Sequence, residues 1–356
     1  MTILYSLCSW GLGHATRGLP MLRRLVKDGH DVIVYTSGRG LALLKSELKD
    51  NVRFIESVPY PSPYSDKIGF AVRFMVIAPK IMGIIKEEVK DVDKIVKENK
   101  VSLIISDSRF GSYCKSVPSY LLFHQLRFIA PLRLPPAEML TEFYNHYLQN
   151  KFEKIIVPDY EENSLSGDLS HNMRYFDKEK IEYIGILSDF EKIDTDKDLD
   201  YLFSISGPEP TRTILEEKLF SQIHLLKGKI AVALGKPDGY TEEVRGNTTI
   251  YSYLEKKRRD ELMNRAKIVI SRSGYTTIMD VAEIDKKALF IPTPGQTEQV
   301  YLAHHLEKTG LFHSVKQRKL KLDRDVKEAL IYKGFTPPWK TAESIERFLK
   351  VIGIKE

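Results

Sequence analysis

The fold is decided by residues 2–35, which read TILYSLCSWGLGHATRGLPMLRRLVKDGHDVIVY. Residues 2–9 form an apolar run typical of a buried strand, and residues 15–28 place leucine and valine at helical spacing. DVIVY at residues 31–35 is a second strand. This stretch therefore predicts two parallel strands that are joined by a helix on one face of a sheet.

The same alternation of strand and helix continues along the chain. Before a charged stretch at 191–200, the expected strands are 52–55, 102–106, 119–123 and 154–157, with a helix at 84–98. After it, the expected strands are 201–206, 229–234, 267–271 and 288–291, and the expected helices are 209–222, 258–266, 275–283 and 299–308. The pattern predicts an α/β protein with two Rossmann-like domains facing each other across a cleft. We expect domains at 1–165 and 166–335, and a last helix in 336–356 that packs on either of them.

Composition and charge narrow the class of protein. The chain has 356 residues, enough for about two domains. Its two cysteines exclude a disulfide framework, and the first residues lack a secretory signal, so we expect a cytoplasmic protein. Residues 1–150 hold 20 Lys and Arg against 14 Asp and Glu, which accounts for the whole net charge of +6. An anionic membrane or a nucleic acid could use this charge, but no nucleic-acid-binding motif is present and we expect no nucleic acid.

The first glycine loop, GLGHATRG at 11–18, lacks two features of a dinucleotide site. Thr16 stands where the third glycine belongs, and the second strand ends without an acidic residue for a ribose. The loop instead delivers His14 to the start of a helix at the top of a sheet. There it either acts as a general base or caps the helix.

Three further loops each leave a strand and enter a helix. SGPEPTR at 206–212 offers backbone N–H groups to an anion. SRSGYTT at 271–277, with Asp280 one turn into its helix, could bind a diphosphate and a ribose, or be an ordinary capped helix with a solvated Asp. PTPGQTEQ at 292–299 gathers polar side chains that suit sugar hydroxyls, or is a polar loop without a ligand.

An apolar, basic stretch at 70–85 carries Arg73, Phe74, Met75 and Lys80. Its charges and Pro79 interrupt it, so it is not expected to span a membrane. It is either a patch that dips into the membrane interface or a helix of the first core.

Metal sites are not expected, because the Asp-x-Asp pairs lie in charged, solvated stretches. Asp107 follows the strand at 102–106, at the end where parallel sheets bind ligands. It either lines a ligand-binding cleft at that edge or caps its own loop.

Taken together, the loops resemble the MurG-like glycosyltransferases of the GT-B fold, glycosyltransferase family 28. The matching stretches are GLGH (11–14), FHQL (123–126), SRSGYTTIMD (271–280), PTPGQTEQVYLA (292–303) and LEKTG (306–310). The second loop departs from the family's G-G-S-x-G, and the glutamine pair reads Gln-Thr-Glu-Gln.

The resemblance implies an inverting transferase that moves a sugar from a nucleotide donor, expected to be a UDP-sugar, to a lipid or lipid-linked acceptor. His14 would be the catalytic residue, without a metal ion or other cofactor. The expected acceptor-side residues are Gly13, Arg17, Asp107, His124 and Gln125. The expected donor-binding residues are Ser206, Gly207, Tyr253, Leu254, Arg272, Ser273, Gly274, Thr276, Asp280, Gln296, Glu298 and Gln299. We expect the protein on the inner face of the cell membrane, with 70–85 against its anionic surface.

Two alternatives share this fold. A nucleotide-sugar hydrolase would keep the glycine loop and its histidine but would need no apolar basic patch. A non-catalytic nucleotide-sugar-binding protein would keep Asp280 and the phosphate loop and would not depend on His14.

Overall fold

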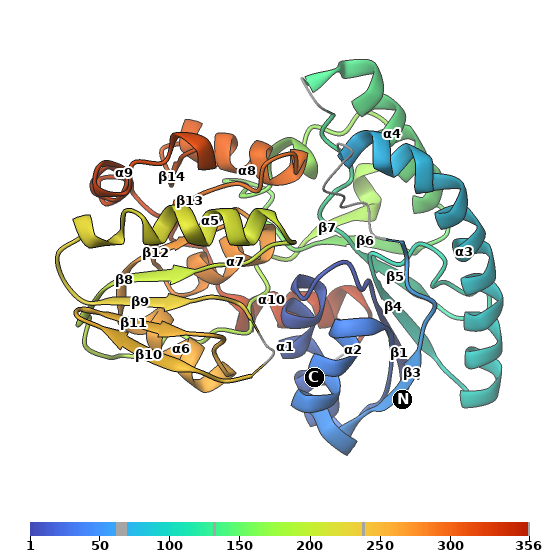
Figure 1. The fold of residues 1–356 in the computed structure, drawn as a ribbon. Coiled ribbons are helices and arrows are strands. Elements are labelled where there is room, and N and C mark those ends of the chain that lie inside the picture. The colour runs from blue at the N-terminus through green and yellow to red at the C-terminus, as the bar shows by residue number, and fades with distance from the viewer. Residues whose placement is uncertain (62–69, 131–132, 237–238, 355–356) are drawn as a thin grey trace. The chain divides into compact units, whose positions relative to one another are not determined.

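The computed structural model describes residues 1–61, 70–130, 133–236 and 239–354 (Figure 1). The chain divides into two compact units. The first comprises Met1–Asp189 and Trp339–Glu356, and the second comprises Phe190–Pro338. The division lies after Asp189 and not after residue 165, because strand β7 (Ile181–Tyr183) pairs with β6 (Lys154–Val157) and extends the first sheet.

Within the described residues, the first unit contains a parallel sheet of seven strands in the order β3-β2-β1-β4-β5-β6-β7. The remaining strands are β1 (Thr2–Leu7), β2 (Asp31–Thr36), β3 (Arg53–Glu56), β4 (Leu103–Asp107) and β5 (Ser119–Leu122). The strand order reverses between β1 and β4. In open parallel sheets, ligands bind beyond the carboxyl ends of the strands at such a point.

Helices cover both faces of this sheet. They are α1 (Gly13–Lys27), α2 (Gly38–Leu48), α3 (Phe70–Asn99), α4 (Pro135–Gln149) and α10 (Thr341–Val351). Alternate side chains of β1 point to opposite faces, so Ile3, Tyr5 and Leu7 pack in a core with α1 and α10. Leu4 packs in a separate core with α3. Helix α10 thus completes a core of the first unit, where Phe348 is fully buried.

In the second unit, the described residues form a sheet of seven strands in the order β10-β11-β9-β8-β12-β13-β14. The strands are β8 (Leu199–Ser204), β9 (Ile230–Ala233), β10 (Glu242–Arg245), β11 (Thr248–Tyr251), β12 (Ala266–Ser271), β13 (Lys287–Phe290) and β14 (His313–Ser314). The helices are α5 (Thr211–Phe220), α6 (Lys256–Arg265), α7 (Tyr275–Glu283), α8 (Thr297–Lys308) and α9 (Leu322–Ala329). Only the edge strand β10 runs antiparallel to its neighbour among the described pairs. The order reverses between β8 and β12, which places the loops after these strands at the ligand-binding edge.

The prediction of an α/β protein with two Rossmann-like domains is confirmed. The helix expected at 84–98 is longer and begins at Phe70. Strands β7, β10, β11 and β14 were not predicted, because all are short and none has the apolar run of a long buried strand; β7, β10 and β14 lie at sheet edges, and β11 lies next to the edge.

Candidate active site

The loop between β1 and α1 places His14 in the first turn of α1. Gly11 adopts a positive φ of 93° at the turn, a conformation that glycine accepts without steric cost. The N-cap position is Leu12, and no side chain caps the helix. Gly18 lets α1 approach the sheet, because a Cβ there would lie 2.8 Å from Leu7 Cδ2. His14 therefore does not cap the helix, and its ring is turned toward the sheet.

Asp107 anchors this ring. It is the last residue of β4 and is fully buried. Its Oδ1 lies 2.8 Å from Nδ1 of His14, and its Oδ2 accepts a hydrogen bond of 2.9 Å from Nε of Arg17. Nη2 of Arg17 also donates to Oδ1. Asp107 therefore contacts two side chains of α1, and it also accepts a hydrogen bond of 3.2 Å from Oγ of Ser108 in its own loop.

Charge explains the state of this carboxylate. Burial alone would raise the pKa of Asp107, but the positive charge of Arg17 and the contact with His14 outweigh it. The pKa of Asp107 therefore lies well below its usual range, and the carboxylate is ionised at neutral pH. The ring of His14 remains partly accessible, with 16% of its side chain exposed.

The segment after β5 adds His124. It is buried, and its Nδ1 lies 3.1 Å from Nη1 of Arg17. Arg17, itself 1% exposed, thus joins groups from α1, β4 and the end of β5. Gln125 is half-buried, and its backbone carbonyl accepts a hydrogen bond from Asn145. The structure brings His14, Arg17, Asp107 and His124 together at the reversal point of the first sheet.

In the second unit, Arg272 ties the loops together. It is 1% exposed, and its guanidinium donates to backbone carbonyls of Thr211 at 2.8 Å and Ile291 at 3.1 Å, and to Oε1 of Gln317 at 2.8 Å. Burial lowers the pKa of Arg272 to about 10, which leaves it charged at neutral pH. These hydrogen bonds of Arg272 go to other parts of the protein. Its role is therefore to hold these loops in position.

The loops held by Arg272 meet beside the start of α7. Ser273 is fully buried and donates to the carbonyl of Gln299 at 2.8 Å, and Oε1 of Gln299 accepts from the amide of Thr293 at 2.9 Å. Gly274 is the N-cap of α7. Within the described residues, the buried atoms Thr293 Oγ1 and Gln296 Oε1 have no hydrogen-bond partner. Buried polar atoms are rarely left in this state without a ligand or a water molecule.

The other expected donor residues lie on the same edge of the second sheet or beside it. Gly207 follows β8 with a positive φ of 119°, and a Cβ there would be 3.8 Å from Thr293 Oγ1. Exposed or half-buried positions are held by Ser206, Tyr253, Leu254, Thr276, Asp280 and Glu298. Sequence reasoning missed Thr293 and Gln317. An unpartnered oxygen is visible only in three dimensions, and Gln317 lies outside every glycine loop.

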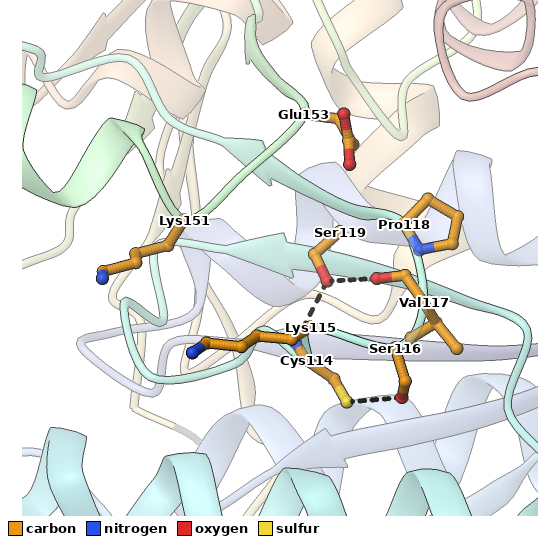
Figure 2. Close-up of a pocket in the computed structure, with 8 residues that line it drawn as sticks. All are labelled: Cys114, Lys115, Ser116, Val117, Pro118, Ser119, Lys151 and Glu153. Atoms are coloured by element: carbon orange, nitrogen blue, oxygen red, sulfur yellow. Dashed lines mark hydrogen bonds between the residues drawn. The ribbon is translucent and has the colours of Figure 1, made fainter.

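A separate pocket lies away from these loops. Figure 2 shows that it is lined by residues 114–119 together with Lys151 and Glu153. These residues precede or begin β5 and β6, whereas Asp107 ends β4 in the same parallel sheet. The pocket therefore opens at the opposite edge of the sheet and is not part of the candidate active site.

The apolar basic stretch is divided between core and surface. Ile77, Ile81, Ile84 and Ile85 of α3 are buried, while Val76 is 67% exposed and Lys80 is exposed. The side chains of Arg73, Phe74 and Met75 lie outside the described residues. In the part of the chain that the structure describes, no helix is long and apolar enough to cross a membrane.

Helix α4 presents an exposed apolar face that the sequence analysis did not identify. Leu140, Phe143 and Tyr147 are 68%, 56% and 60% exposed, and the hydroxyl of Tyr144 contacts Met82 of α3. Their spacing of three and four residues places them on one side of the helix, and this spacing was the available signal. We call residues 140, 143, 144 and 147 the α4 face.

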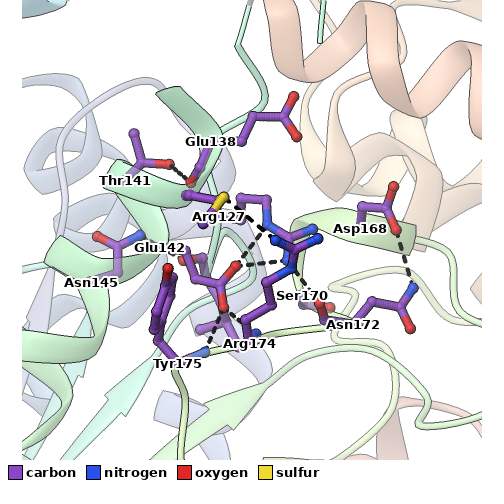
Figure 3. A network of polar contacts seen from close by, with 12 residues as sticks. Arg127, Glu138, Thr141, Glu142, Asn145, Asp168, Ser170, Asn172, Arg174 and Tyr175 are labelled. Atoms are coloured by element: carbon purple, nitrogen blue, oxygen red, sulfur yellow. Dashed lines mark hydrogen bonds and ion pairs between the residues drawn. The ribbon is translucent and has the colours of Figure 1, made fainter. Parts of the chain in front are cut away.

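A buried polar network fixes the other side of α4 (Figure 3). Oε2 of Glu142 accepts hydrogen bonds of 3.0 and 2.7 Å from Nε and Nη2 of Arg127, and its Oε1 accepts from the amide of Tyr175 at 2.9 Å. Glu142 is fully buried. Because a buried ion pair tolerates little displacement, the network holds α4 in one rotation and directs the α4 face outward.

One group in the described part of the chain could hold a metal ion: His313, Asp325 and Glu328. The Nε2 atom of His313 lies 3.9 Å from Asp325 and 3.6 Å from Glu328. Both oxygens of Asp325 are already used, one by Arg324 and the other by the amide of Lys321. The group belongs to β14 and α9 and includes no residue of the loops described above.

Comparisons with known proteins place the whole chain among glycosyltransferases. Residues 209–346 match the glycosyltransferase family 28 C-terminal domain, and residues 1–122 match glycosyl transferase family 1. An uncharacterized glycosyltransferase of Methanosarcina mazei is 23% identical over 334 residues, covering 87% of this chain and 84% of that protein.

One further relative and one solved structure of similar fold extend over nearly the whole length of the chain. The UDP-N-acetylglucosamine–N-acetylmuramyl-(pentapeptide) pyrophosphoryl-undecaprenol N-acetylglucosamine transferase of a Sulfurihydrogenibium species is 23% identical, covering 96% of this chain and 91% of that protein. The crystal structure of Acinetobacter baumannii MurG matches with a TM-score of 0.57 at 13% identity, covering 99% of this chain and 98% of that one.

The ion pair of Asp107 makes a pH-dependent contribution to stability. We expect Asp107→Asn to lower the free energy of unfolding at pH 7 by about 3–5 kcal/mol, because it leaves the buried Arg17 charge without a counterion. The pKa of Asp107 is lower in the folded state than its ordinary 3.8, so the contribution is full above that value and is lost as the pH falls. In urea unfolding, the difference in the free energy of unfolding between wild type and Asp107→Asn should therefore become smaller below about pH 4.

The exposed Asp31 pairs with Arg53 and provides the control. Asp31→Asn should cost no more than about 1 kcal/mol. If the stability lost in Asp107→Asn, measured as free energy of unfolding, stays constant down to about pH 3, the role of the ion pair is contradicted.

Proposed function

Since the chain is a MurG-like glycosyltransferase with the two-domain GT-B fold, we propose that it moves a sugar from a UDP-sugar to a hydroxyl of a lipid or lipid-linked acceptor. The transfer inverts the anomeric carbon and uses no metal ion. The observation on which the proposal rests is the contact between His14 and the buried carboxylate of Asp107, at the edge of the first sheet where ligands bind.

His14 is the general base of this proposal. Its Nδ1 is held by Asp107, and the ring is partly exposed, so its Nε2 is the atom that takes the proton of the acceptor hydroxyl. The acceptor oxygen then attacks the anomeric carbon, and the bond from that carbon to the diphosphate breaks. A carboxylate–histidine arrangement of this kind orients the imidazole and stabilises its protonated form.

The second unit supplies the donor site. The start of α7 at Gly274 directs backbone N–H groups and the positive end of the helix dipole toward the leaving diphosphate. This stabilisation does the work of a metal ion. The unpartnered oxygens of Thr293 and Gln296 bind sugar hydroxyls. Glu298 and Gln299 contact the same sugar, and Asp280 binds the ribose.

The acceptor is proposed to come from a membrane. The Sulfurihydrogenibium relative is named for a pyrophosphoryl-undecaprenol acceptor, which is a lipid-linked substrate. The α4 face and the exposed Val76 and Lys80 of α3 belong to the same unit as His14. Exposed aromatic residues and cations of this kind suit the interface of an anionic membrane, and we place the protein on its cytoplasmic face.

Loss of the base should separate catalysis from binding. We expect His14→Ala to lower turnover by roughly 10²–10⁴ while UDP affinity stays within about twofold of wild type. His224→Ala, at an exposed position in the second unit, should leave both unchanged. The measurements are steady-state transfer kinetics and calorimetric titration with UDP. Equal losses in binding and turnover would recast His14 as a donor-binding or structural residue.

Loss of the ribose ligand should act on binding. We expect Asp280→Ala to weaken UDP binding by about 1.5–3 kcal/mol, the range for a hydrogen bond to a charged group. Asp323→Ala, an exposed aspartate of α9, is the matched control. An unchanged UDP affinity in a folded Asp280→Ala protein, measured by calorimetry, would remove Asp280 from the site.

Membrane contact distinguishes a lipid acceptor from water or a soluble acceptor. Co-sedimentation with anionic vesicles should be weakened by salt, and Arg73→Glu with Lys80→Glu should reduce it at least tenfold, since each cation contributes about 1 kcal/mol. Phe143→Ser with Tyr147→Ser should reduce binding even at high salt. Ile331→Ser, at a position 82% exposed in the second unit, should have no effect.

Thermal melts of each variant test whether the fold is kept. A stable wild-type protein that ignores vesicles would contradict the lipid acceptor. Release of free sugar from a UDP-sugar without any acceptor would favour the hydrolase, and UDP binding without turnover would favour a non-catalytic binding protein.

A further inference from the structure

Arg17 contacts Asp107, His14 and His124 in the candidate active site of the first unit. Its Nε and Nη2 donate to Asp107, its Nη2 lies 3.0 Å from Nδ1 of His14, and its Nη1 lies 3.1 Å from Nδ1 of His124. The side chain is 1% exposed. Because the guanidinium is buried, a substrate cannot bind to it directly. Arg17 therefore acts by positioning the side chains that it contacts.

The contact with Asp107 decides where His14 carries its proton. An ionised carboxylate only accepts hydrogen bonds, and a guanidinium only donates them. Oδ1 of Asp107 is 2.8 Å from Nδ1 of His14, so Nδ1 must carry a hydrogen for this contact to be attractive. Nη2 of Arg17 and Nδ1 of His14 are then two donors that share this one acceptor oxygen, and the 3.0 Å between the two nitrogens is the spacing of two N–H groups directed at Oδ1, not a hydrogen bond between them. The proton of a neutral His14 is on Nδ1, and Nε2 keeps its lone pair.

The contact between Arg17 and His124 requires the opposite tautomer, with the proton of neutral His124 on Nε2. Nη1 of Arg17 can only donate, so Nδ1 of His124 must accept. A neutral imidazole that accepts at Nδ1 carries its proton on Nε2. Arg17 therefore holds two neighbouring histidines in different tautomers, His14 through the carboxylate of Asp107 and His124 through its own Nη1.

We propose that Arg17 is the positioning residue of the transferase, which fixes His14 as a proton acceptor at Nε2 and His124 as a proton donor at Nε2. The kinetic part of this inference rests on the proposed function, whereas the assignment of the tautomers does not. The base would then receive the hydroxyl proton of the acceptor, and the N–H of His124 would point its positive end away from Arg17.

Arg17 also sets the charge beside the base. The groups that face His14 are Arg17 on α1, Asp107 at the end of β4 and, through Arg17, His124 after β5. Arg17 and Asp107 together are neutral. Removal of the guanidinium leaves one buried negative charge beside His14, and the pair of His14 and Asp107 then holds a proton more tightly.

The first experiment is a pH–rate profile of Arg17→Met, which keeps much of the length of the side chain and removes the charge. We expect kcat at pH 7 to fall about 10- to 100-fold, the donor KM to change little, and the acidic limb of the profile to move up by about one to three pH units. Activity should therefore recover in part at high pH. Arg17→Lys should keep the limb near its wild-type position.

Arg53→Met provides a matched control, because Arg53 is 50% exposed at the amino end of β3. It should leave the profile unchanged. If Arg17→Met lowers activity equally at every pH and the limb stays in place, Arg17 is merely structural and the proposal is overturned.

The second experiment reads the tautomers directly and needs no turnover. Nitrogen NMR of the wild-type protein with labelled histidines should show a protonated Nδ1 in neutral His14 and a protonated Nε2 in neutral His124, assigned with His14→Ala and His124→Ala. A proton on Nε2 of His14, or on Nδ1 of His124, would overturn the proposal. If wild type transfers no sugar while both tautomers are as expected, only the proposed function fails. If Arg17→Met does not fold, Arg17→Lys and the wild-type spectrum still decide the assignment.

Discussion

The buried contact between Arg17 and Asp107 is the interaction on which the first unit's site depends. A carboxylate without exposure would be costly to ionise, and a guanidinium without exposure would be costly to bury, so each is stable only with the other. The pair can form because β4 ends next to β1 and because α1 approaches the sheet at Gly18. The geometry of His14 and His124 then follows, since each ring bonds to a member of the pair.

The second unit also contains a buried arginine that organises its site, but the charge is compensated in a different way. Arg272 is as buried as Arg17, but its partners are backbone carbonyls and the amide oxygen of Gln317 in place of a carboxylate. Several neutral dipoles thus compensate one charge. The carbonyls belong to Ser206 after β8, Ile291 after β13 and Thr211 at the start of α5, so the buried side chain also sets the spacing of these loops. The first unit uses its buried arginine to order titrating side chains, and the second uses one to order backbone.

Much of this arrangement was predictable from the sequence, for a physical reason. Central strands such as β1, β4 and β12 are buried on both faces, so each appears in the sequence as an apolar run followed by a loop. The residues at the ends of these runs, His14, Asp107 and Gly274, could therefore be named as candidates from the sequence alone. The contacts that give these residues their properties were not predictable. Whether His14 caps its helix or meets a carboxylate depends on the pairing of β1 with β4, and their partner residues are separated by about 100 positions.

Other features depend equally on long-range packing. The α4 face has a recognisable spacing, but whether that face is covered depends on the ion pair of Glu142 with Arg127, which fixes the rotation of the helix. The boundary between the units follows the short edge strand β7, whose three half-buried residues leave little trace in the sequence. The charged stretch at 191–200 was the better marker of this boundary, since it begins where the second unit begins.

The position of α10 has a consequence for biosynthesis. This helix brings Phe348 and Leu349 to a core that otherwise consists of residues from the first 190 positions, including Leu19 and Leu22 of α1. A ribosome releases α10 only after the whole of Phe190–Pro338 has been made. The second unit is continuous and can close its core as soon as it emerges, whereas the first must wait with part of its apolar surface uncovered. The portion that is translated first is therefore the last to become complete, and the nascent chain is most prone to aggregation during that interval.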